Sequence, residues 1–137
     1  MIRLVIDASV SIKWFIRGRS EHHVPKALEI LKGIGDKQIC IVQPPHWFAE
    51  TISVLARLQP EIVGRAIELL DAMEIPTRAM VPDYKLASHM ALNLNHHLFD
   101  TLYHAVALRD DSTFITADER YFNKAFDLGS IKLLNDY

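Results

Sequence analysis

Four acidic residues stand close to the ends of expected strands or at the starts of expected helices. They are Asp7 in LVIDAS, Glu50 in WFAETI, Asp100 in LFDTLY and Asp118 in ITADER. Two unshielded carboxylates about 4 Å apart repel each other by roughly 4 kcal/mol at an effective dielectric near 20. A cluster of such groups would take up protons or bind a cation. Oxygen ligands without cysteine favour Mg²⁺ or Mn²⁺, and paired ions of this kind can drive phosphodiester displacement.

Each acid also has a purely structural interpretation. Most acidic side chains are solvated, and Asp100 and Asp118 are positioned to cap the helices that they begin. Asp7 is harder to explain in this way, because it ends an apolar run and is followed by the small residues Ala8 and Ser9. Position alone therefore leaves a metal site and ordinary surface acids about equally open.

Composition limits the class of protein. A chain of 137 residues, half of them hydrophobic, predicts one domain over residues 1–137 with a true core. No apolar stretch is long enough to span a bilayer, and the start MIRLVIDAS does not resemble a secretory signal, so we expect a cytoplasmic protein with no membrane contact. The single cysteine, Cys40, is expected to be a buried thiol. The net charge of −2 offers no general attraction to nucleic acid, so binding a polyanion would need a local device.

The order of elements predicts an α/β fold. Compact apolar runs predict strands, at 2–6, 38–42, 112–116, 131–134 and, more weakly because Pro76 and Pro82 flank it, 75–82. Apolar residues at helical spacing predict helices, at 24–31, 46–58, 62–73, 83–95, 100–109 and shortly after 118. Alternating strands and helices favour a three-layer α/β/α sandwich around a central, mainly parallel sheet of about five strands. Trp14 falls in a helical pattern and is expected to pack in this core or against a partner.

This arrangement would gather the acids. Groups just beyond the carboxyl ends of parallel strands meet in one crevice, which is the position expected for Asp7 and Asp118. Glu50 lies early in the helix after the second strand. The helix that Asp100 begins runs antiparallel to the strand that follows it, so its start should lie near the same edge. The sequence therefore predicts that all four carboxylates meet.

The segments VIDASVSIKWF, PPHWFAETISVL and LFDTLYHAVALRDDSTFITADERYF resemble the PIN domain, and more narrowly the VapC-like toxins. The last block is the most specific, with its D-x-x-Y start, alanine-containing helix, strand and T-A-D. The resemblance covers essentially the whole chain. It implies that Asp7, Glu50, Asp100 and Asp118 form an acidic metal-binding quartet. It also implies that the hydroxyls of Ser9 and Thr116 lie beside the quartet and contact substrate.

By this resemblance the protein is a Mg²⁺-dependent endoribonuclease, with Mn²⁺ as a substitute, and the toxin of a type II toxin–antitoxin system. Metal-activated water would cleave RNA and leave a 5′-phosphate. The expected partners are the RNA substrate, a cognate antitoxin protein and a second copy of the chain in a homodimer. Two alternatives stay open: a PIN nuclease of RNA processing, and an inert PIN-like binding module, since Ser53 stands where these toxins often have Asn. A phosphoacceptor domain is disfavoured, because Lys132 lies within the last strand rather than after it.

Several cations are candidates for substrate contact. Lys13 and Arg17 follow Asp7 closely and are predicted to line one side of the crevice and bind RNA. Arg57 shares a helix face with Glu50 and offers a second route for the RNA backbone. The alternative for each is simple exposure to solvent.

Histidines and one further acid are open cases. His104 lies one turn after Asp100 and either approaches the metal or is buried with its own partner. His96 and His97 precede the same helix and are expected to be solvated rather than ligating. Glu119 is a possible fifth acid of the site, although Asp118 is better aligned.

Overall fold

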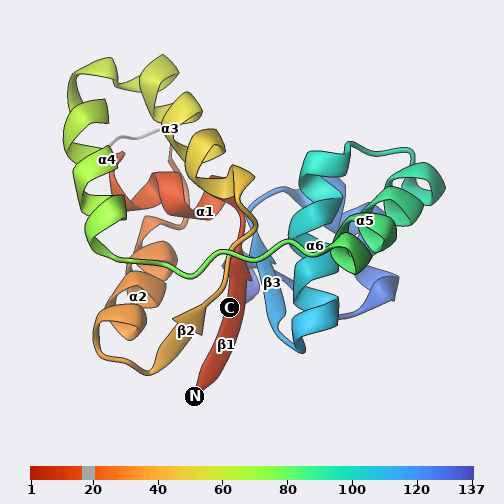
Figure 1. Ribbon diagram of the computed structural model, residues 1–137. Coiled ribbons are helices and arrows are strands. Elements are labelled where there is room, and N and C mark those ends of the chain that lie inside the picture. Colours follow the sequence, from red (N-terminus) through yellow and green to blue (C-terminus); the bar gives the residue numbers. More distant parts are fainter. Residues whose placement is uncertain (17–20) are drawn as a thin grey trace.

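The computed structural model describes residues 1–16 and 21–137, and its centre is a parallel sheet (Figure 1). The strands are β1 (Ile2–Ile6), β2 (Ile39–Ile41), β3 (Thr113–Thr116) and β4 (Ile131–Leu133). They lie in the order β2-β1-β3-β4, and every pair is parallel. The chain therefore builds outward from β1 to β2, returns, and continues on the other side of β1. This reversal makes the boundary between β1 and β3 the switch point of the sheet.

Helices enclose the sheet on both sides. They are α1 (Ala8–Ser11), α2 (Val24–Gly35), α3 (His46–Leu58), α4 (Val63–Ala72), α5 (Val81–Leu94), α6 (Leu98–Asp110) and α7 (Glu119–Ala125). The helix α2 packs on β2, and α6 packs on β1 and β3 from the opposite side (Figure 1). The α/β architecture is confirmed. None of the described helices combines the length and the apolar character needed to cross a membrane.

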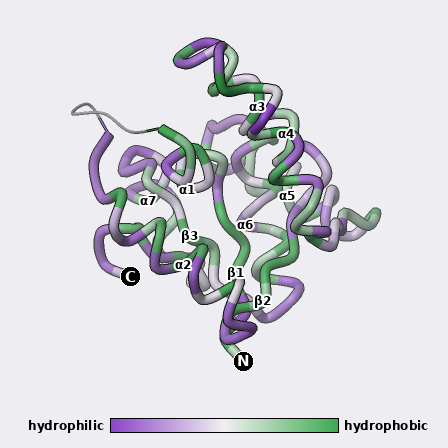
Figure 2. The backbone as a smooth tube through the Cα atoms, turned by 90° about the vertical axis from the view of Figure 1, so that its left-hand side faces the viewer, coloured by the Kyte–Doolittle hydropathy of each residue, from purple (hydrophilic) through white to green (hydrophobic). Residues whose placement is uncertain are grey.

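The core lies along the two central strands. Hydrophobic residues run along β1 (Figure 2), and its Val5 and Ile6 are fully buried together with Ile115 of β3. The two tryptophans are also buried, and each indole N–H has a partner: Trp14 donates to the Ala27 carbonyl at 2.9 Å, and Trp47 donates to Ser11 Oγ at 3.0 Å. Trp14 thus packs in the core, one of the outcomes that its helical spacing allowed.

The fifth strand expected at 75–82 does not form. The segment makes only one isolated bridge, between Gln43 and Thr77, so the sheet has four strands. The Gln43 N–H donates to the Pro76 carbonyl at 3.0 Å, and the Arg78 N–H donates to the Gln43 carbonyl at 2.9 Å. The ladder cannot extend, because the next donors in this register would be the N–H groups of residues 76 and 45, and both residues are prolines.

The buried side chain of Gln43 replaces part of the missing ladder. Its amide carbonyl accepts from the Ile6 N–H at 2.8 Å, and its amide N–H₂ donates to the Ile6 carbonyl at 2.7 Å. These hydrogen bonds satisfy the end of β1 just before Asp7. Gln43 therefore fixes the backbone from which the first acid of the predicted site projects.

Gly33 lies inside α2. The helix expected at 24–31 would end before this residue, but α2 continues through it to Gly35. A Cβ built on Gly33 would lie 2.4 Å from Cδ1 of Ile39, on β2. The glycine therefore lets α2 approach the sheet closely, at the cost of some helix propensity.

Asp83 is a fully buried acid outside the predicted quartet, and arginines hold it. Its carboxylate accepts from Arg109 Nε at 2.7 Å, from Arg78 Nη2 at 3.2 Å and from the Met80 N–H at 2.7 Å. Burial alone would raise the pKa of Asp83, but these hydrogen bonds outweigh burial and lower the pKa below its usual value. Asp83 is therefore a structural carboxylate that stays ionised.

We expect Asp83→Asn to lower the free energy of unfolding by roughly 3 kcal/mol at pH 7, because two arginines lose their shared counter-charge. Since the folded-state pKa is lowered, the stabilisation exists above the unfolded pKa and is lost as the pH falls through the folded one. The deficit should thus shrink in urea unfolding below about pH 4. Asp71→Asn, at an exposed acid on α4, is the control and should change little. Equal stability of Asp83→Asn and the parent at pH 7 would contradict this account.

Candidate active site

Asp7 leaves β1 at the switch point and is anchored through one carboxylate oxygen. Its backbone N–H donates to the Ile115 carbonyl at 2.9 Å, which ties it to the neighbouring strand β3. Its Oδ2 accepts from the hydroxyls of Ser9 at 2.9 Å and Thr116 at 2.7 Å. The hydroxyl positions that the family resemblance implied therefore orient the Asp7 carboxylate.

Asp118 is joined to Asp7 through the same hydroxyls. The Asp118 N–H donates to Thr116 Oγ1 at 3.0 Å, and the Ala117 N–H donates to Ser9 Oγ at 3.1 Å. The Asp118 side chain also caps α7, because its Oδ1 accepts from the Tyr121 N–H at 3.0 Å. The capping interpretation is thus correct for Asp118, but it uses only one of the two carboxylate oxygens.

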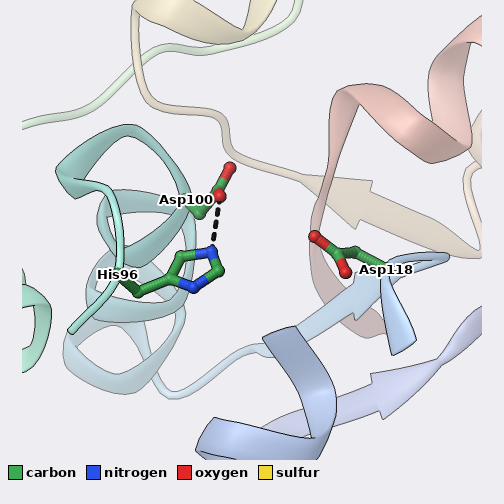
Figure 3. Close-up of side chains that lie close together, drawn as sticks. All are labelled: His96, Asp100 and Asp118. Carbon is green, nitrogen blue, oxygen red and sulfur yellow. Dashed lines mark hydrogen bonds and ion pairs between the residues drawn. The ribbon is translucent and has the colours of Figure 1, made fainter. Parts of the chain in front are cut away.

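Asp100 lies in the first turn of α6 and faces Asp118 across a short gap (Figure 3). It is not the N-cap, because α6 already begins at Leu98. Its Oδ2 is hydrogen-bonded to Nε2 of His96 at 2.7 Å. The next residue, Thr101, donates to the Ala87 carbonyl at 2.8 Å and so holds this end of α6 against α5.

The tautomer of His96 follows from its partners. Lys124 Nζ lies 3.3 Å from His96 Nδ1, and an ammonium group can only donate, so Nδ1 is an acceptor. Nε2 therefore carries the proton and donates it to Asp100. In this state His96 orients the carboxylate, and the side chain is only 8% exposed. Its ring packs on Tyr121 with centroids 4.9 Å apart.

Glu50 enters from α3. A buried set of hydrogen bonds joins α3 to α1: Trp47 Nε1 donates to Ser11 Oγ, and Ser11 and Thr51 hydroxyls lie 2.8 Å apart. Glu50, next to Thr51, has Tyr103 OH at 3.5 Å from Oε2 and His46 Nε2 at 3.3 Å from Oε1. Tyr103 is the second member of the D-x-x-Y pattern and stacks on Phe114 of β3.

The acids influence one another's charge. Burial, together with the negative charges of Asp100 and Asp118, raises the pKa of Asp7 to about 6, although the two hydroxyl hydrogen bonds act to lower it. Burial also raises the pKa of Glu50 to about 7, together with the charges of Asp7 and Asp100. The four predicted carboxylates are therefore linked by repulsion, Asp7 with Asp100 and Asp118, and Glu50 with Asp7 and Asp100. No arginine or lysine among the described residues is paired with any of them.

The donor set fits a divalent cation that prefers oxygen. Each aspartate has one oxygen held by the protein, whereas Asp7 Oδ1, Asp100 Oδ1 and Asp118 Oδ2 accept no hydrogen bond from the described residues. Ligand atoms of His96, Asp100 and Asp118 all lie within 4.8 Å of one another. Carboxylates anchored at one oxygen and open at the other are suited to hold Mg²⁺ or Mn²⁺.

The other predicted substrate contacts lie differently. Lys13 is buried, and its ammonium pairs with Glu21 at 2.6 Å, so any contact with RNA would require this pair to open. Arg17 and its neighbour Arg19 lie outside the described residues. Arg57 is exposed on α3, and Glu119 is exposed at the start of α7.

His104 follows the structural alternative. It is fully buried, its Nε2–H donates to the Gly129 carbonyl at 2.7 Å, and its Nδ1 accepts from Tyr121 OH at 2.9 Å. Both ring nitrogens are therefore used within the protein. Burial lowers its pKa, so the ring is held neutral.

Two histidines that contact the acids were not predicted. His96 was expected to be solvated, and His46 was considered only as a helix start. Both stand four residues before an acid, in His46-x-x-x-Glu50 and His96-x-x-x-Asp100. The i, i+4 spacing that relates Asp100 to His104 also relates each of these histidines to the acid that follows it, and this spacing is the sequence signal for both contacts.

The sheet and its acids define the class as a parallel α/β protein with an acidic crevice at the switch point. The family, which has a nuclease-type fold, follows from the comparison of sequences. The PIN domain model matches residues 4–127, so the chain belongs to the PIN domain family. A search of curated proteins found no match to the chain.

In metal-free protein, we expect Asp7→Asn to raise the free energy of unfolding at pH 8 by on the order of 2 kcal/mol. The folded-state pKa of Asp7 is raised to about 6, so ionising this carboxylate costs stability as the pH rises from about 4 to 6. Asparagine avoids that cost while its amide oxygen keeps the two hydroxyl hydrogen bonds. The gain should largely vanish near pH 4, close to the unfolded pKa, in urea unfolding with chelator. A variant that is destabilised equally at both pH values would contradict this, and Asp127→Asn, at an exposed acid, is the control.

Proposed function

We propose that this protein is a Mg²⁺-dependent endoribonuclease that hydrolyses RNA phosphodiesters, with Mn²⁺ as a substitute. The observation that carries the proposal is the open oxygen on each of three aspartates whose other oxygen is fixed by the protein. Structural acids of this chain look different, since Asp83 is enclosed by arginines. Membership of the PIN family, a nuclease-type fold, supports the same conclusion.

In this proposal Asp7 and Asp100 hold the principal ion, and Glu50 and Asp118 complete the site directly or through water. A divalent cation bound there would activate a water for attack on phosphorus and stabilise the departing 3′-oxygen, which leaves a 5′-phosphate. The chain's own part is preorganisation. Hydrogen bonds from the hydroxyls of Ser9 and Thr116 orient the Asp7 carboxylate, and the hydrogen bond from the His96 N–H orients the carboxylate of Asp100. Fixed ligands of this kind need little rearrangement when substrate binds.

We further propose that the protein is the toxin of a toxin–antitoxin pair, inhibited by a small antitoxin and active as a homodimer. This narrower assignment rests on the likeness of the VIDAS, D-x-x-Y and T-A-D segments to VapC-like toxins. Growth arrest on expression, relieved by co-expression of a short open reading frame immediately upstream, is the expected result. Unimpaired growth despite ribonuclease activity in vitro would favour a role in RNA processing instead.

We expect the purified protein to cleave a mixed RNA pool in Mg²⁺, to stop on chelation and to resume when Mg²⁺ is returned. Asp7→Asn and Asp100→Asn should each slow cleavage by roughly 100-fold or more, because each removes a charged ligand worth several kcal/mol. Asp71→Asn on α4 is the matched control and should cleave like the parent. Products should carry a 5′-phosphate, which a 5′-phosphate-dependent exonuclease would detect.

The outcomes separate the alternatives. Folded Asp7→Asn and Asp100→Asn proteins that cleave as fast as the parent would rule out this site. A parent protein that binds RNA yet leaves it intact in both Mg²⁺ and Mn²⁺ would be the inert module. Thermal unfolding of each variant shows whether a loss of cleavage reflects chemistry or folding.

We expect His96→Ala to weaken Mg²⁺ and Mn²⁺ binding by about 10–100-fold, the usual effect of removing a group that orients a metal ligand. His96→Gln retains an N–H donor and should recover part of this affinity. Isothermal titration calorimetry measures the effect without reference to cleavage. His89→Ala, at an exposed histidine on α5, should leave metal affinity unchanged. Parent-like metal affinity in His96→Ala would show that Asp100 needs no such support.

A further inference from the structure

A cavity opens beside the acidic site, on the far side of His96 from Asp100. It has a volume of about 200 Å³ and is lined by Asn95, His96, His97, Arg120 and Lys124. No carboxylate belongs to this lining. His96 belongs to both places, because its Nε2 binds Asp100 and its Nδ1 faces Lys124. A single imidazole ring therefore separates the cavity from the proposed metal site.

The cavity is rich in cationic donors. Arg120 and Lys124 stand four residues apart on α7, so they share one face of this helix. Lys124 Nζ donates to the Asn95 carbonyl at 3.1 Å and to His96 Nδ1 at 3.3 Å, and both of these partners are neutral acceptors. Arg120 is exposed and makes no ion pair with any acid among the described residues. Neither positive charge is neutralised at short range.

Most other cations near the sheet are already neutralised. Lys13 pairs with Glu21, Arg3 and Arg78 pair with Asp110, and Arg109 pairs with Asp83. A chain with a net charge of −2 and an acidic site repels a polyanion unless cations are concentrated locally. Arg120 and Lys124 supply such a concentration directly beside the acids.

We propose that this cavity binds a phosphate of the RNA backbone next to the linkage that is cleaved, with Arg120 and Lys124 as its cationic donors. The proposal rests on the proposed function of the neighbouring carboxylates. Arginine offers a planar fork that matches phosphate oxygens, and lysine adds a point charge. A backbone held on one side of His96 would present the adjoining phosphodiester to Asp100 and Asp118 on the other.

The test measures binding of a short RNA with a 5′-hydroxyl, so that only internal phosphodiesters are present. Fluorescence anisotropy on the Asp100→Asn background keeps the RNA intact and is independent of cleavage. Adding Arg120→Gln or Lys124→Gln should weaken binding about fivefold each at 0.1 M salt, and each should reduce the slope of log K against log salt by about 0.7. Lys85→Gln, at an exposed lysine on α5, is the matched control and should have a much smaller effect.

Other outcomes overturn the proposal. One is unchanged RNA affinity when Arg120→Gln and Lys124→Gln are combined on the Asp100→Asn background. The proposal would then fail even if the cavity bound an acidic protein instead. If Arg57→Gln weakens RNA binding whereas Arg120→Gln and Lys124→Gln do not, the RNA lies along α3 instead. An effect seen only with 5′-phosphorylated RNA would assign the cavity to a terminal phosphate. Parent protein that never cleaves, but shows the expected binding pattern, would remove the proposed nuclease while leaving the phosphate site.

Discussion

The mutual repulsion of carboxylates at one edge of a parallel sheet is the constraint on which this structure depends. Asp7 and Asp118 meet because β1 and β3 are neighbours at the switch point, and the helices carrying Glu50 and Asp100 bring two more negative charges to the same place. Ionising such a group is unfavourable without a cation, because burial and, after it, the charges of the neighbouring acids raise the pKa values of Asp7 and Glu50. The fold tolerates it through rigid neighbours: the Gln43 side chain at the end of β1, shared hydroxyls, and the buried Ser11–Thr51 contact.

The electrostatic surroundings of an acid, rather than its residue type, separate the two classes of carboxylate in this chain. Asp83 and Asp110 are also buried or nearly so. Hydrogen bonds from the Met80 N–H and the Ser112 hydroxyl, together with the surrounding arginines, lower their pKa values despite burial. Asp7 and Glu50 have only hydroxyl, imidazole or acidic neighbours, and their pKa values rise. Acids that lack a cationic partner lower the stability of the fold, so stability alone does not explain them. Four such acids, from four segments that meet at one point, favour a bound cation as the compensating charge.

Much of the fold could be predicted because strong periodicity and strong terminators coincide. β1 and α3 begin and end at the expected residues, since an apolar run ends at Asp7 and prolines bracket the helix. The prediction of a strand at 75–82 was wrong, because a strand there would need backbone N–H groups that proline lacks. The helix expected at 24–31 extends further, through Gly33, because the close contact of Gly33 with Ile39 is tertiary and leaves no local signal. The convergence of the acids followed from topology, whereas the pairing of Lys13 with Glu21 is a contact between side chains that local patterns do not encode.

Charge is divided sharply on either side of His96, and this division gives the site a direction. On one side the ring donates to Asp100, within a group that needs a cation; on the other it accepts from Lys124, beside a cavity that needs an anion. A neutral ring can serve both only in the tautomer with its proton on Nε2, so the two hydrogen bonds reinforce each other. A nucleic acid strand together with a divalent cation would satisfy both needs at once, because one phosphate can share the cation with the acids while the phosphate joined to it is bound by Arg120 and Lys124. The net charge of the chain is therefore a poor guide to its binding partner, since the relevant charges are local and of opposite sign.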